Sequence, residues 1–137
     1  MDCCIVADVK SILSLVLALA APLAAHHSFS AQFDATKQVT IEGTVTKIAW
    51  ANPHVYFFVD VKGEDGTIAT WACETNGPNG LIRQGWKRES MKVGDHVIVN
   101  AYLARDGTKT VDARAVTFAD GRKVFTGSAG DSAPKAN

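Results

Sequence analysis

The chain has 137 residues, of which 47% are hydrophobic and 20% charged, so it is long enough for one ordinary globular domain and too short for two. Its 14 basic and 14 acidic residues balance and are interleaved along the chain. This balance argues against a strong electrostatic grip on nucleic acid or on an anionic membrane, and we expect no nucleic-acid partner.

An apolar stretch near the start predicts an exported protein. The sequence SILSLVLALAAPLAA (residues 11–25) follows Lys10 and is shorter than the roughly 20 residues that span a bilayer. It ends in small residues that suit signal peptidase. We expect residues 1–25 to be removed as a signal peptide, leaving a periplasmic or secreted chain without membrane contact; an uncleaved anchor is the alternative.

Cysteine usage fits this prediction. The chain has three cysteines, and Cys3 and Cys4 would leave with the leader. Cys73 then remains alone, so the mature chain forms no internal disulfide. We expect Cys73 to be buried in a strand.

The first half of the mature chain reads as three strands. The segment VTIEGTVTKIAW (39–50) alternates apolar and polar residues, as a half-buried strand does, and Gly43 in its middle predicts a bend or bulge. Two further strands are expected at 54–61 and 67–74. The turn sequence KGEDG (62–66) joins them into a hairpin.

The second half adds a short helix and two strands. A helix is expected within 78–86, where Pro78 suits a first turn, and a strand follows within 89–104. The last strand falls within 110–125, and residues 126–137 read as a disordered tail. This order predicts one all-β domain over 26–125, a five-stranded OB-like Greek-key barrel with one short helix. A small β-sandwich or an SH3-like barrel is the alternative.

Familiar catalytic motifs are absent from the sequence. It contains no Gly-rich phosphate loop, nucleophile elbow, Cys-x-x-Cys or His-Glu-x-x-His. Most acidic residues of the mature chain fall in expected turns, where charge is usually solvated surface. The sequence therefore predicts a protein that is not an enzyme.

Histidines are the first candidate binding residues. A cut after Ala24 would place His27 third in the chain, where the amine, two amide nitrogens and an imidazole form a square-planar set for Cu(II) or Ni(II). A cut after Ala25 would start the chain at His26, whose amine and imidazole chelate copper together. His54, after an Asn-Pro pair, is a candidate third nitrogen. The alternative is that these histidines are polar surface.

Aromatic residues are the second candidate. Four rings come from the first three expected strands and would line the ligand-binding face of an OB-fold, where flat rings stack on sugars or bases. They are Trp50, Tyr56, Phe58 and Trp71. The alternative, which the sequence favours, is that a small twisted sheet buries both of its faces.

The motifs together resemble a known family. AHHSFSAQFD, VTIEGTVTKIAWANPHVYFFVDV, NGLIRQGW and MKVGDHVIV are similar to a family of small exported bacterial proteins known mainly as a domain of unknown function. The resemblance covers roughly residues 25–125. It implies export and a small all-β barrel, and it places His26, His27 and His54 on positions of the family pattern. It implies no activity.

These observations predict an exported binding module whose most concrete ligand is Cu(II) or a related divalent metal ion. The rival hypothesis is a structural or interaction domain that docks on another exported protein or a polysaccharide. A redox enzyme built on a histidine brace is a weaker third hypothesis. The sequence leaves the oligomeric state, the cleavage site and the distance from His54 to the mature N-terminus open.

Overall fold

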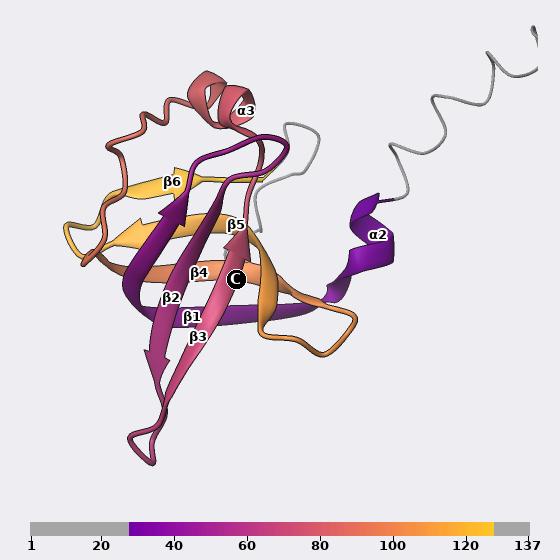
Figure 1. The fold of residues 1–137 in the computed structure, drawn as a ribbon, viewed down its shortest axis with the longest axis vertical. Helices are drawn as coiled ribbons and strands as arrows, with labels where there is room; N and C mark the ends of the chain where they lie inside the picture. The colour runs from indigo at the N-terminus through magenta and orange to yellow at the C-terminus, as the bar shows by residue number, and fades with distance from the viewer. Residues whose placement is uncertain (1–27, 128–137) are drawn as a thin grey trace, which may run out of the picture. The chain divides into compact units, whose positions relative to one another are not determined.

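The protein is described here by a computed structural model, which defines residues 28–127 (Figure 1). By its contacts the chain divides into two units, Met1–Ala31 and Gln32–Asn137, and the barrel belongs to the second. The elements in the described range are α2 (Ser28–Gln32), β1 (Phe33–Ala49), β2 (Tyr56–Lys62), β3 (Ile68–Glu74), α3 (Pro78–Arg83), β4 (His96–Ala104), β5 (Thr110–Phe118) and β6 (Lys123–Phe125).

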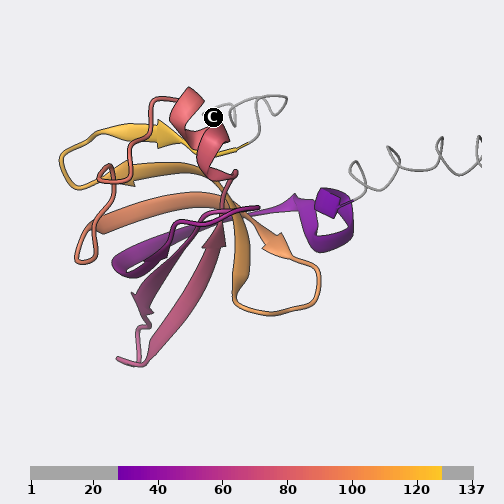
Figure 2. The ribbon, with the colours of Figure 1, turned by 45° about the horizontal axis from the view of Figure 1, so that its top comes forward.

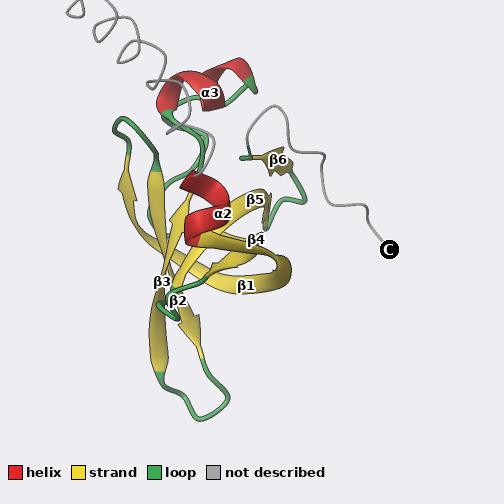
Figure 3. Cartoon of the chain, turned by 90° about the vertical axis from the view of Figure 1, so that its right-hand side faces the viewer, coloured by secondary structure: helices red, strands yellow, loops and turns green. Residues whose placement is uncertain are grey.

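The strands form one sheet that curls into a ring. Their order is β3-β2-β1-β4-β5-β6, and β3 also pairs with β5 in parallel, so the first five strands close on themselves. Helix α3 lies in the chain between β3 and β4 (Figure 3). A five-stranded Greek-key ring with a helix at this point is the predicted OB-like barrel, and the fold prediction is confirmed.

Strand β1 connects the two parts of the ring because it pairs with two different strands. Its first part pairs with β4 from Phe33 to Thr44, and its second part pairs with β2 from Thr44 to Ala49. The irregularity in the pairing of β1 with β2 lies between Val45 and Lys47, and Gly43 lies next to Thr44, where the two pairings meet. A Cβ atom on Gly43 would overlap the carbonyl oxygen of Asp60 on β2, so only glycine permits this approach of the two strands.

The core is filled by the alternating apolar positions that the sequence shows. Val45, Val59, Val97 and Val116 are almost completely buried, as branched side chains on the inner face of a small barrel should be. Cys73 is buried among them, and burial raises the pKa of its thiol to about 12. The predicted burial of Cys73 is thus confirmed.

The structure also extends beyond the predicted elements. β1 begins at Phe33 rather than Val39, because Phe33 is buried and pairs with Ala104 on β4, although residues 34–37 carry no apolar pattern. β6 is a short sixth strand. Thr126 and Gly127 are buried against the barrel, where the Thr126 amide donates to the carbonyl of Arg114. The remainder of the expected tail, 128–137, lies outside the described residues, as does the expected leader.

We expect Gly43→Ala to destabilise the barrel strongly. The added methyl group has to push β1 away from the Asp60 carbonyl, and overpacking of this kind costs roughly 2 kcal/mol or more. Urea denaturation followed by tryptophan fluorescence measures the change. Thr44→Ala, on an exposed position of the same strand, is the control and should lower the free energy of unfolding much less. Equal losses in both variants would contradict the role given to Gly43.

Candidate functional site

His54 lies in the loop between β1 and β2, and two acceptors hold its ring. Its Nδ1 atom is 3.0 Å from the carbonyl oxygen of Thr75 and 3.2 Å from Oε1 of Glu74. A carbonyl oxygen can only accept, so this network assigns the ring proton to Nδ1. The neutral ring therefore keeps its lone pair on Nε2, and the side chain is 46% exposed.

The backbone around His54 is fixed by its neighbours. The Val55 amide donates to the carbonyl of Asn76, and the Thr75 amide donates back to the carbonyl of Val55. Gly77 lies so close to this loop that a Cβ atom there would be 2.5 Å from the Pro53 carbonyl oxygen. These contacts extend the β2–β3 pairing past the strand ends, and they give the imidazole a defined orientation.

Glu74 connects His54 to Tyr56. Glu74 as a residue is 7% exposed, and its Oε2 atom accepts a hydrogen bond of 2.6 Å from the Tyr56 hydroxyl. Burial first, and then the hydrogen bond to Glu74 and its negative charge, raise the pKa of Tyr56 well above the ordinary 10.0. The buried carboxylate is thus solvated by a hydroxyl and an imidazole instead of water.

An ion pair between Asp112 and Arg114 lies beside Glu74 on the outer face of the sheet. Asp112 on β5 stands in register with Glu74 on β3, and it accepts a hydrogen bond of 2.9 Å from Arg114. The Arg114 guanidinium is buried and lies 5.5 Å from the centre of the Tyr102 ring. Two carboxylates, in register with each other, and one guanidinium therefore lie at the seam where β3 meets β5.

Sequence reasoning missed this polar cluster. Glu74, Asp112 and Arg114 were not among the candidates, because each occupies an ordinary polar position of a strand. The alternation in VDARAV (111–116) marks the polar face, yet it carries no information about which strand lies alongside. Only the parallel β3–β5 pairing brings Asp112 next to Glu74.

The four predicted aromatic residues do not form one outward face. Trp50 and Trp71 are half-buried and pack against the hydrophobic core, whereas Tyr56 and Phe58 lie on the opposite face of β2. Phe58 is covered in part by Lys47, whose Nζ atom is 5.3 Å from the ring centre. The four rings lie on different faces for two reasons. Successive side chains of β2 point to opposite faces of the sheet, and Trp50 follows the end of β1 and packs against the core.

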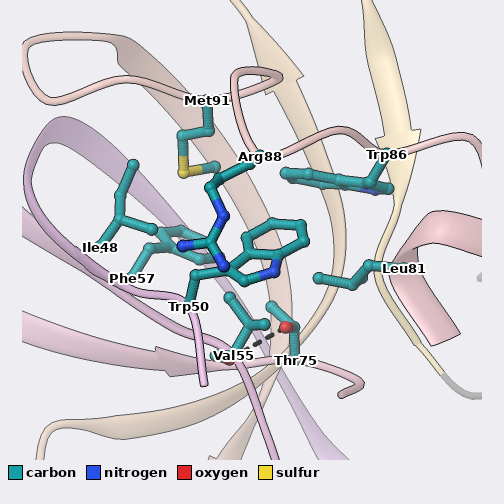
Figure 4. Close-up of a pocket in the computed structure, with 9 residues that line it drawn as sticks. All are labelled: Ile48, Trp50, Val55, Phe57, Thr75, Leu81, Trp86, Arg88 and Met91. Atoms are coloured by element: carbon teal, nitrogen blue, oxygen red, sulfur yellow. Dashed lines mark hydrogen bonds between the residues drawn. The ribbon is translucent and has the colours of Figure 1, made fainter. Parts of the chain in front are cut away.

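Trp50 instead lines a shallow apolar pocket at one end of the barrel. Figure 4 shows the Arg88 side chain over Trp50, at 5.7 Å from guanidinium carbon to ring centre, with Leu81 and Trp86 nearby. The indole N–H of Trp86 donates to the carbonyl of Phe125. The cavity measures about 10 Å³, which is room for one water molecule, so side chains fill the pocket in this conformation.

The predicted metal ligands are described only in part. His26 and His27 lie outside the described residues. Between residues 28 and 127 no three His, Cys, Asp or Glu side chains lie close enough together to hold a metal ion. His96 is 3.1 Å from Glu42 on the outer face of β4 and β1. Within the same range no helix is long and apolar enough to cross a membrane.

Fold and surface together define a small OB-like barrel with a polar cluster beside its β1–β2 loop. The chain belongs to a family of unknown function (DUF6152), whose model matches residues 14–113. This match confirms the predicted membership in a family without assigned activity. No curated protein and no solved structure matches the chain significantly.

The raised pKa of Tyr56 predicts a loss of stability at alkaline pH. The folded state binds the phenolic proton more tightly than the unfolded state, so its contribution to stability is complete below the unfolded pKa of about 10 and is lost as the pH rises beyond it. Urea denaturation at several pH values above about 9 measures this loss.

Tyr56→Phe is the matched variant, since it keeps the ring and removes the titrating group. We expect its free energy of unfolding to fall less steeply with pH than that of the unaltered chain. Both proteins keep Cys73, whose buried thiol contributes in the same direction, so the difference between the two slopes isolates Tyr56. If the free energy of unfolding fell with pH at the same slope in both proteins, the inference that the Tyr56–Glu74 pair holds the phenolic proton would be contradicted.

Proposed function

We propose that the mature chain is an exported binding module for Cu(II) or a related divalent metal ion, and that it catalyses no reaction itself. The ligands are His26 and His27 at the new N-terminus, with His54 as the third histidine. The observation that carries the proposal is the orientation of His54, whose Nδ1–H donates to the Thr75 carbonyl and whose Nε2 lone pair remains for a metal.

The chemistry of the mature N-terminus supports the proposal. Removal of the leader after residue 24 or 25 turns an internal amide into a free amine next to His26. An amine, amide nitrogens and imidazole suit the tetragonal geometry of Cu(II). This part of the site needs only a correctly cut chain, because its nitrogens are consecutive in the sequence.

The surroundings of His54 support it in a second way. Histidine ligands usually donate their other ring N–H to a carbonyl or carboxylate, which fixes the tautomer and raises the basicity of the ligating nitrogen. His54 has both kinds of acceptor, the Thr75 carbonyl and the Glu74 carboxylate. His96 also has a carboxylate partner, Glu42, at its Nε2 atom, but no backbone carbonyl partner is found for its ring among the described residues.

Copper affinity of histidine variants tests the proposal. Protein recovered from its host's periplasm is titrated with Cu(II) against a competing chelator, and native mass spectrometry gives the N-terminus and the stoichiometry. We expect one Cu(II) per chain, an affinity loss of about 100-fold or more in His26→Ala/His27→Ala, and about 10-fold or more in His54→Ala.

His96→Ala is the matched control, since His96 is also an exposed histidine beside a carboxylate. It should bind Cu(II) as the unaltered chain does. Unchanged affinity in the His26/His27 variant, or a correctly cut chain that stays metal-free when Cu(II) is supplied, would overturn the metal proposal. Loss in the His26/His27 variant alone would restrict the site to the N-terminus and remove His54 from it.

A further inference from the structure

The hairpin of β2 and β3 reaches beyond the rest of the barrel. β1 pairs with β2 only as far as Asp60, and β5 pairs with β3 only from Ala72 to Glu74. Between these limits, and among residues 28–127, β2 and β3 pair only with each other, and Figures 1 and 2 show this ribbon projecting from the barrel. A two-stranded ribbon is marginally stable in water, and further strands stabilise it.

The outer edge of β3 carries open backbone groups. Thr67 accepts from Gly63 across the hairpin, whereas the Ala72 amide points the other way and donates to Lys109. Because strand residues alternate, Ile68 and Thr70 also direct their N–H and C=O groups away from β2. In the part of the chain that the structure describes, no other segment pairs with these four groups.

The open edge is short, since only two of its residues point outward, but it lacks three other features that normally prevent strand addition. Natural edges are protected by charged residues, proline or bulges. Residues 67–71 read TIATW, without a charge or a proline, and their pairing with β2 is regular. Ile68 is 67% exposed, more than the other exposed large apolar side chains of the described residues.

We propose that two copies of this chain pair through their β3 edges, antiparallel and related by a two-fold axis at Ile68. Ile68 of each copy then exchanges both backbone hydrogen bonds with Ile68 of the other. Thr70 comes opposite Gly66, whose amide already donates to the carbonyl of Gly63, so the ladder between the copies ends there. The two ribbons become one four-stranded antiparallel sheet, and each Ile68 side chain is covered by the other copy.

Charge complementarity favours a second copy over an unrelated strand. In this register the hairpin tip of one copy, with the exposed Glu64 and Asp65, runs toward Ala72 of the other. Ala72 is bonded to the carbonyl of Lys109, whose side chain is exposed. The loop of residues 105–109 carries Arg105 and Lys109 against one acidic residue, Asp106, so a net acidic tip meets a net basic loop twice, once on each side of the axis.

Sedimentation equilibrium of the mature chain over a wide concentration range tests the proposal. We expect a monomer–dimer equilibrium whose dissociation constant rises at least about tenfold in Ile68→Lys, because the change places two like charges on the axis. Val93→Lys is the matched control, since Val93 is 64% exposed on a loop before β4, and it should leave the equilibrium unchanged.

A charge exchange tests the register. Lys109→Glu should weaken the dimer, and adding Glu64→Lys to it should restore association. A chain that stays monomeric at every concentration overturns the proposal and leaves the edge to a strand of another protein. A dimer that Ile68→Lys does not weaken also overturns it, since the copies would then meet elsewhere. Circular dichroism of each variant confirms that the fold is kept.

Discussion

The close approach of β1 to β2 at Gly43 is the constraint on which the rest of the structure depends. β1 pairs with β4 along its first part and with β2 along its second part, and beside the point where the two pairings meet Gly43 lies against the Asp60 carbonyl. Once β1 turns there, β2 and β3 lie across the other strands, and β3 comes beside β5. The seam between β3 and β5, with its buried Glu74 and Arg114, exists only because the ring closes in this way.

Much of this architecture could be predicted from local patterns. Alternation from Val39 to Val45 and the turn chemistry of KGEDG predict the strands and the hairpin, because both signals depend on neighbouring residues alone. The order of strands and helix then predicts the ring. The start of β1 at Phe33 was not predictable in this way, since residues 34–37 show no strand pattern and Phe33 pairs with Ala104, far along the chain.

The site was less predictable than the fold because it, too, depends on contacts between residues that are far apart in the sequence. The Asn-Pro pair before His54 marks a loop that presents a side chain, and this much is local. The acceptors of that side chain, Thr75 and Glu74, come from the far strand of the hairpin and depend on the register that pairs Tyr56 with Glu74. Whether an aromatic residue faces in or out likewise depends on where each strand ends, which placed Trp50 and Trp71 on the core side.

A small barrel limits where binding can occur. Valine side chains fill the ring, and the apolar pocket lined by Trp50 and Arg88 holds no more than a water molecule, so neither of these parts of the described barrel has room for a ligand in this conformation. The candidate sites lie instead on loops, strand edges and chain ends. The two proposals use different ones: His54 lies where β2 begins, whereas the open edge of β3 lies at the other end of the hairpin. The two proposals share no residue. A monomer that binds copper is therefore physically consistent, and so is a dimer that binds no copper. Each experiment tests one proposal.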